Sequence, residues 1–151
     1  MNEDFLDMLS ALSEEGVRFL VVGAYALAHH GLPRATGDLD LWVERTAASP
    51  AHVLRALQRF GAPLGEVSAD DFAEPDLVIQ IGVAPCRIDL MTSIDGVSFE
   101  DAWGERVELE LEGVPVPILS KRHLIANKRA VGRPQDLADL AWLESEATEP
   151  A

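Results

Sequence analysis

The chain has 151 residues, of which 48% are hydrophobic and 25% charged, a composition typical of a folded domain rather than a disordered segment. The net charge of −14 argues against a protein that binds DNA through its overall field, because phosphate contacts require Lys and Arg. No run approaches the ~18 apolar residues of a membrane span, and the single cysteine, Cys86, excludes an internal disulfide. We therefore expect a cytoplasmic protein that does not bind membranes.

Hydrophobic spacing predicts alternating helices and strands in the first half of the chain. Phe5, Leu9 and Leu12 follow helical spacing, and Gly16 ends that helix. Ser49 and Pro50 suit the N-cap and the first position of a later helix. In chain order we expect a helix over 4–15, a strand over 17–22, a helix over 24–30, a strand over 39–43, a helix over 49–60, and a Pro-, Gly- and acid-rich stretch over 62–76 with one short turn at 68–72.

The second half continues this alternation and ends in two helices. Val107, Leu109 and Leu111 alternate with charged residues, so we expect them to face inward from one strand. Pro115 and Pro117 favour a sheet edge for the next strand. In chain order we expect strands over 77–81 and 86–91 joined as a hairpin by 82–85, a helix capped by Ser98 through 103, strands over 106–111 and 114–118, a helix capped by Ser120 through 131, and a last helix over 134–145.

These elements predict one domain of the α/β (α+β) class, with a mixed β-sheet flanked by helices. The domain is expected to span 1–145, and 146–151 to form a disordered tail.

Basic residues gather near the end of this acidic chain. Five of the twelve Lys and Arg residues lie within thirteen positions: Lys121, Arg122, Lys128, Arg129 and Arg133. A local positive patch on an acidic body fits a small anionic ligand, such as a nucleoside triphosphate, better than a long polyanion. The acidic remainder would attract a basic protein partner.

The turn at Gly23-Ala24 follows the apolar run 19–22 and precedes a short helix. Free backbone N–H groups at such a turn, together with the positive end of a helix, form an anion-binding site. Many strand-to-helix turns contain glycine, so this pattern taken alone favours a purely structural turn.

Asp38 and Asp40 lie at i and i+2 within an apolar strand. Their side chains leave the same face, with Cα atoms roughly 6.5 Å apart. Two anions held this close repel each other unless a cation lies between them. A capping or turn role for Asp38 after Thr36-Gly37 is the alternative, but it leaves Asp40 unexplained.

Asp89 is a third acid in an apolar strand, 86–91, where an unpaired carboxylate is costly. A salt bridge to Arg87, Arg34 or Lys128 would explain it. If its strand instead lies beside that of Asp38, three carboxylates meet on one sheet face. Such a hard-oxygen site suits Mg²⁺.

Gly23-Ala24, a gap of thirteen residues, Asp38-Leu-Asp40-Leu and the later Asp89 resemble the polymerase-beta-like nucleotidyltransferase superfamily. The stretches 23–41 and 124–139 resemble its small prokaryotic branch, which includes minimal nucleotidyltransferases and those of abortive-infection or toxin–antitoxin systems. The resemblance implies a single nucleotidyltransferase-like domain.

The resemblance also implies roles for particular residues. Asp38 and Asp40 would bind Mg²⁺, or Mn²⁺, that bridges the triphosphate, and Asp89 would complete the metal site and favour deprotonation of the acceptor hydroxyl. Gly23 and Ala24 would hold phosphates through backbone N–H groups. Beyond the resemblance, Arg34 and Thr36 lie in the loop that enters the strand of the Asp pair and could contact phosphate, and Lys128 could neutralise the triphosphate.

For Thr36, Lys128 and Trp42 the sequence leaves two roles open. Thr36 could simply fix its turn, and Lys128 could pair with Asp136 and Asp139 between the last two helices. Trp42, on the face of the Asp pair, could flank a base or pack in the core.

Ala24 departs from the Gly or Ser that the family usually has there, so a side-chain hydroxyl for phosphate is missing. We expect a Mg²⁺-dependent enzyme that moves a nucleoside monophosphate from a triphosphate to a protein side chain or RNA end. It could act in a toxin–antitoxin or phage-defence system, with a homodimer or a cognate partner. A weak or inactive binding module and a triphosphate hydrolase are the alternatives.

Overall fold

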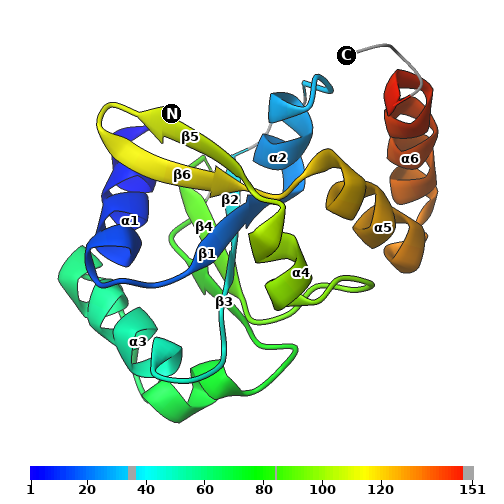
Figure 1. Cartoon of the computed structure of the whole chain (residues 1–151). Helices are drawn as coiled ribbons and strands as arrows, with labels where there is room; N and C mark the ends of the chain where they lie inside the picture. The colour runs from blue at the N-terminus through cyan, green and yellow to red at the C-terminus, as the bar shows by residue number, and fades with distance from the viewer. Residues whose placement is uncertain (34–36, 84, 148–151) are drawn as a thin grey trace.

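The computed structural model describes residues 1–33, 37–83 and 85–147, and it shows six strands in one mixed sheet (Figure 1). The order across the sheet is β3-β4-β2-β1-β6-β5. The pairs β1–β6 and β2–β4 are parallel, and the pairs β1–β2, β3–β4 and β5–β6 are antiparallel. The strands are β1 (Phe19–Val22), β2 (Asp38–Val43), β3 (Val78–Ile81), β4 (Arg87–Met91), β5 (Val107–Leu111) and β6 (Val114–Ile118).

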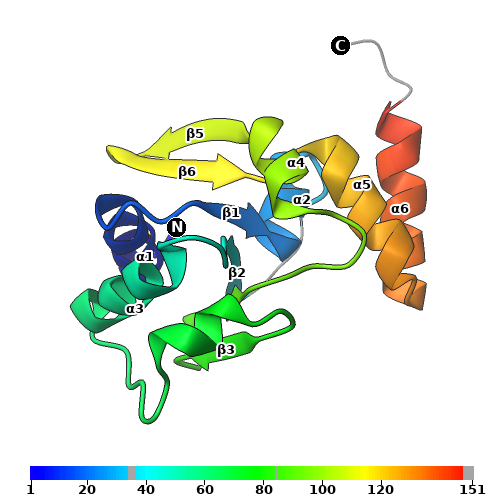
Figure 2. The ribbon, with the colours of Figure 1, turned by 60° about the horizontal axis from the view of Figure 1, so that its bottom comes forward.

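Six α-helices and one 3₁₀ turn accompany the sheet within the described residues. Helices α1 and α3 lie side by side at one side of the sheet, whereas α5 and α6 pack together at the other (Figures 1 and 2). The helices are α1 (Glu3–Glu14), α2 (Gly23–His29), α3 (Ser49–Phe60), η1 (Ala69–Ala73), α4 (Phe99–Gly104), α5 (Lys121–Val131) and α6 (Pro134–Ala147). The predicted α/β class and mixed sheet are confirmed.

The two faces of β2 carry different chemistry because successive side chains alternate. Leu39, Leu41 and Val43 are fully buried and belong to the core with apolar residues of α1 and α3. The opposite face carries Asp38, Asp40 and Trp42. Burial of one face therefore fixes the register of β2 and directs both acids away from the main core.

Most helix starts follow the predicted caps, but α3 does not. Ser98 and Ser120 accept hydrogen bonds from Asp101 N and His123 N, as N-caps do. In α3 the N-cap is Ala48, and Ser49 is already helical. The cap prediction for Ser49 is wrong because Pro50 occupies the second helical position, which has no intrahelical N–H bond to lose.

The predicted edge position of β6 is also wrong, because β6 lies between β1 and β5. Leu119 N donates to Val21 O, so the nitrogens of Pro115 and Pro117, at alternate positions, face the β1 side. The β1 pairing is at Val21↔Ile118, beyond both prolines. The N–H groups that proline lacks are therefore not needed by the ladder to β5.

The outer strand at this end of the sheet is instead β5, and the predicted position of one of its side chains is wrong. Leu109 is 37% exposed rather than inward-facing. Among the described elements, β5 has its close contacts with β6 and not with a helix that would cover its face, so alternation in the sequence did not translate into burial here. Helix α6 continues to Ala147, and 148–151 lie outside the described residues, so the division into a domain and a tail stays a prediction.

Candidate functional site

Parallel pairing of β2 and β4 brings the three predicted acids to one place on the sheet. Asp40 lies opposite Asp89, and Asp38 lies opposite Arg87. Because side chains alternate along each strand, all four groups leave the same face. The condition for a three-carboxylate cluster, that the strand of Asp89 neighbours that of Asp38, is met.

Arg87 bridges two of these acids. Its Nη2 donates to Asp38 Oδ2 at 2.7 Å and to Asp89 Oδ2 at 3.1 Å, and its Nε donates to Asp89 Oδ1 at 3.1 Å. The hydrogen bond to Asp89 is the main reason that the pKa of Arg87 is raised. Of the three cations considered for Asp89, Arg87 is the one that pairs with it, while Arg34 lies outside the described residues, as does Thr36.

Asp40 differs from the other two acids because it lies against the backbone of the Gly23 turn. The pairing Val22↔Asp40 places the two side by side. A Cβ added at Gly23 would overlap this carboxylate, lying 2.9 Å from its Cγ, and Gly23 has a φ of +66°. Glycine is thus required here by close approach as well as by conformation.

The pKa of Asp40 is raised to about 6, first by burial and then by the negative charges of Asp89 and Asp38. A carboxyl group in this setting binds a proton more readily than an exposed one, and a bound cation would oppose that tendency. The cluster is therefore electrostatically suited to a positive ligand.

Across 1–33, 37–83 and 85–147, no group of three or more His, Cys, Asp or Glu side chains is gathered as a ready metal site. Asp38 and Asp89 are instead engaged in ion pairs with Arg87. The chemical type of these donors nevertheless suits a hard divalent cation, since all are carboxylates. The guanidinium of Arg87 already occupies the position of a cation between two of them.

A cleft of about 430 Å³ opens at the Asp40 end of the sheet, facing α5 and α6. It is lined by Gly23, Asp40 and Ser93 from the sheet side, and by Asn127 and Lys128 from α5. The cleft therefore joins the predicted phosphate turn, one predicted metal ligand and the predicted phosphate-binding lysine.

Lys128 lies in a buried ion-pair network between α5 and α6. Its Nζ is 3.1 Å from Asp136 Oδ1 and 3.2 Å from Asp139 Oδ2, and its side chain is only 11% exposed. Arg133 Nε donates to Asp136 Oδ2 at 2.6 Å. The structural alternative considered for Lys128 is thus present, and its role toward a nucleotide stays a prediction.

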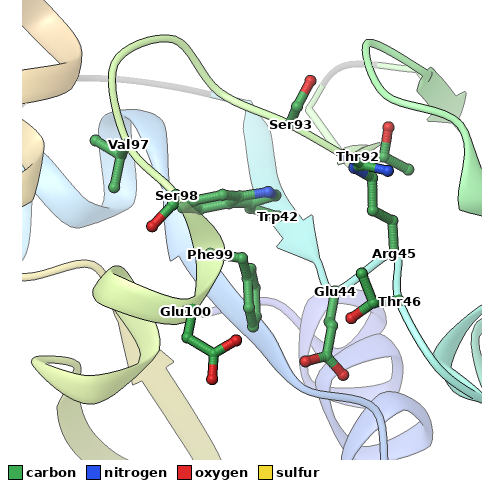
Figure 3. A pocket seen from close by; sticks show the side chains of 10 residues that line it. All are labelled: Trp42, Glu44, Arg45, Thr46, Thr92, Ser93, Val97, Ser98, Phe99 and Glu100. Carbon is green, nitrogen blue, oxygen red and sulfur yellow. The ribbon is translucent and has the colours of Figure 1, made fainter.

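A second cavity of about 290 Å³ lies around Trp42 (Figure 3). Trp42 is 2% exposed and meets Phe99 edge to face, with ring centroids 5.0 Å apart. Its Nε1 has no hydrogen-bond partner in the described part of the chain. Ser93 lines this cavity as well as the carboxylate cleft, so the two adjoin. Core packing, the alternative weighed for Trp42, is what the structure shows.

Two residues of the site were not predicted as part of it. Arg87 precedes Asp89 by two positions in a strand, and this spacing placed both on one face, but its contact with Asp38 depends on the pairing of β2 with β4. Asn127 lines the cleft and donates to Asp95 O at 3.0 Å. No local pattern indicated it.

Comparison with protein families decides the class of the chain. Residues 1–149 match the family model described as "Nucleotidyl transferase of unknown function (DUF2204)". The chain belongs to this family. The predicted nucleotidyltransferase resemblance is thereby confirmed, whereas its toxin–antitoxin setting stays a prediction. No curated protein matches this DUF2204 member.

Solved structures show the same fold. The chain is similar to TM1012 of Thermotoga maritima, assigned as a nucleotidyltransferase, with 16% identity, 93% and 91% of the two chains covered and a TM-score of 0.60. It is also similar to the antibiotic-resistance factor ANT(2'')-Ia, with 16% identity, 96% and 84% coverage and a TM-score of 0.61. A third similar structure is a nucleotidyltransferase-like protein of Paracoccidioides brasiliensis, with 16% identity, 95% and 77% of the two chains covered and a TM-score of 0.52. At these identities the likeness concerns the fold alone.

Among the helices of this DUF2204 member that the structure describes, none is long and apolar enough to span a bilayer.

Proposed function

We propose that the chain is a metal-dependent nucleotidyltransferase that moves a nucleoside monophosphate from a triphosphate to an acceptor hydroxyl on a protein side chain or an RNA end. One observation carries the proposal: Asp38, Asp40 and Asp89 share a face of two neighbouring parallel strands, beside a cleft that contains Gly23. Family membership supports the reaction class.

Asp38, Asp40 and Asp89 would hold Mg²⁺ or Mn²⁺, and the metal would polarise the transferred phosphoryl group and stabilise the charge that develops on it. The backbone N–H groups of Gly23 and Ala24 would bind phosphate oxygens. A carboxylate oxygen of Asp89 would accept the proton of the acceptor hydroxyl. The chain thus supplies positioning and charge rather than a covalent intermediate.

Ala24 limits phosphate binding in this proposal. A serine there would add a hydroxyl donor, whereas alanine leaves only its backbone N–H. We expect weaker triphosphate binding than a serine at this position would give.

A catalytically weak binding module is the second candidate, and two observations favour it. Arg87 already pairs with Asp38 and Asp89, and Ala24 lacks a side-chain donor. In this case the fold would act as a protein partner, in a homodimer or with a cognate toxin or antitoxin.

Isotope position distinguishes the candidates. The purified chain is incubated with Mg²⁺, host extract and triphosphates labelled at the α- or the γ-phosphate. Nucleotidyl transfer places the α-label on a macromolecule and releases the γ-label in pyrophosphate. Hydrolysis by the chain would release the γ-label as phosphate, and a binding module would give no label transfer or release above that of the extract alone. RNase or protease treatment then identifies the acceptor as RNA or protein.

The control is a matched pair of substitutions. Asp38→Ala with Asp40→Ala should abolish α-label transfer, whereas Asp70→Ala removes an exposed carboxylate on η1 and should leave it unchanged. Equal labelling by the Asp38/Asp40 variant would refute the proposal.

A further inference from the structure

Arg87 is the positively charged side chain that contacts two acids of the carboxylate cluster in the described residues. Its Nη2 bridges Asp38 Oδ2 and Asp89 Oδ2, and its Nε engages the other oxygen of Asp89. Both oxygens of Asp89 and one of Asp38 are therefore directed at the guanidinium. A divalent cation bound by these carboxylates would need the same oxygens, so the two cations exclude each other at this position.

The charges show why Arg87 alone does not complete the cluster. Among the described side chains of the cluster, the guanidinium of Arg87 brings one positive charge against the three negative charges of Asp38, Asp40 and Asp89 when all three are ionised. A divalent cation supplies the missing charge. If a metal ion displaces the guanidinium of Arg87 from the carboxylates and the guanidinium then binds a nearby anion, both cations have an anionic partner.

Arg87 is also free to move in a way that Lys128 is not. The Arg87 side chain is 34% exposed, whereas Lys128 is 11% exposed and held by two buried acids. Rotation about the side-chain torsions of Arg87 can release the carboxylates without disturbing the sheet, because its contacts with the two acids are all made by the guanidinium.

We propose that Arg87 is a resident counter-cation that competes with the divalent metal for Asp38 and Asp89, and that the displaced guanidinium binds oxygens of the incoming triphosphate. This inference rests on the proposed function. The planar fork of arginine suits paired phosphate oxygens as well as carboxylates, so one side chain can exchange one for the other. The exchange couples metal binding to triphosphate binding without any covalent step.

Metal binding without nucleotide tests the first half. Mn²⁺ is titrated into the full chain, and the fall of the free Mn²⁺ signal is followed by electron paramagnetic resonance. Arg87→Gln should bind Mn²⁺ roughly three- to tenfold more tightly than the wild type, because a competing ion pair is gone. Arg87→Lys keeps the charge but loses the fork, and should show a smaller gain.

Arg59→Gln is the matched control, because it removes one positive charge on α3, where Arg59 pairs with Glu14 and Glu15. It should leave Mn²⁺ affinity unchanged. Circular dichroism confirms folding, and Arg87→Lys serves if Arg87→Gln does not fold. Equal affinity in the wild type and both Arg87 variants overturns the inference.

Nucleotide binding tests the second half. With Mn²⁺ at saturation, calorimetry measures the affinity for an α,β-methylene triphosphate analogue. Arg87→Gln should bind it roughly three- to tenfold more weakly, opposite in sign to its effect on metal. Unchanged or tighter analogue binding overturns the phosphate role and leaves the competition intact.

The proposed function fails in a distinguishable way. If neither the wild type nor the Arg87 variants bind Mn²⁺ above the level of Asp38→Asn, the metal site itself is absent and both proposals fall. If Asp38→Asn abolishes Mn²⁺ binding but Arg87→Gln does not alter it, only the counter-cation is wrong.

Discussion

The carboxylate cleft and the Trp42 cavity adjoin at Ser93, yet their central side chains are held by different kinds of contact. In and beside the cleft, charged groups meet charged partners: Arg87 with Asp38 and Asp89, and Lys128 with Asp136 and Asp139. At the Trp42 cavity, Trp42 packs edge to face on Phe99, and its buried indole N–H has no partner among the described residues, although most of the other lining residues are polar or charged.

The ion-paired side chains of the cleft can change partners, whereas the packed aromatic side chains at Trp42 maintain the structure. An ion pair can be replaced by another ion pair at small net cost, since both partners stay charged and hydrogen-bonded. A packed aromatic contact has no such substitute, because removing it leaves a void. Substitution of the acids around Arg87 should therefore alter ligand affinity and activity, whereas substitution of Trp42 should leave activity nearly unchanged.

Removal of the paired acids should give the largest effect. We expect Asp38→Ala with Asp40→Ala to lower the rate of nucleotidyl transfer at least a thousandfold, roughly the several kcal/mol that metal polarisation contributes. Trp42→Phe, tested in parallel, should change the rate only a few-fold. Initial rates of α-label transfer measure both, and a similar loss in the two variants would contradict the division between the regions.

Gly23→Ala should strongly destabilise the fold. The added Cβ would overlap the Asp40 carboxylate, and a φ of +66° is unfavourable for alanine. We expect a loss of about 3 kcal/mol in the free energy of unfolding, measured by urea denaturation. Gly61→Ala is the control, because Gly61 also has a positive φ, +90°, but nothing lies within 4 Å of its Cβ position.

The control isolates the contact with Asp40. Gly61→Ala should cost about 1–2 kcal/mol from backbone conformation alone. Adding Asp40→Ala to Gly23→Ala should recover the excess. Equal losses in the two glycine variants would show that close approach plays no part at Gly23.

The Lys128 network should contribute stability that depends on pH. The pKa of Asp136 is lowered to about 2, first by the hydrogen bond from Arg133 and then by Lys128, while burial opposes the shift. A lowered pKa in the folded state means that the contribution is present above the unfolded pKa of about 4 and is lost as the pH falls toward 2.

Asp136→Asn removes this contribution. At pH 7 the variant should be less stable by about 2 kcal/mol, and the gap to the wild type should close between pH 4 and pH 2. Thermal unfolding at a series of pH values measures the gap. A gap that stays constant over this range would assign the loss to packing rather than to ionisation.

Much of the site followed from local patterns in the sequence. Spacing i, i+2 within an apolar strand placed Asp38 and Asp40 on one face, and the same spacing placed Arg87 beside Asp89. The Gly23 turn followed from an apolar run ending in glycine. These features depend on a few consecutive residues, which a sequence displays directly.

Features that depend on strand pairing were not accessible in the same way. The contact of Arg87 with Asp38 requires the register of β2 against β4, 49 residues apart. The predicted edge position of β6 was wrong because a proline removes an N–H donor on only one side of a strand. The sequence does not show on which side a neighbouring strand needs that donor. Gly23 was expected to serve phosphate binding, whereas its approach to Asp40 is a long-range contact.

Trp42→Phe should have the smallest effect on stability, for a reason specific to its cavity. The substitution loses part of an aromatic ring, which costs packing, but it also removes a buried N–H with no partner among the described residues, and burial of such a donor costs roughly 1–3 kcal/mol. The two terms oppose each other, so the free energy of unfolding should change by less than about 1 kcal/mol, measured by urea denaturation. Trp42→Leu keeps the removal of the donor but also loses the edge-to-face contact with Phe99, and should therefore be clearly less stable than Trp42→Phe. A cost above about 2 kcal/mol for Trp42→Phe would mean that the indole N–H has a hydrogen-bond partner in solution. The cavity would then resemble the cleft, in which charged side chains have charged partners.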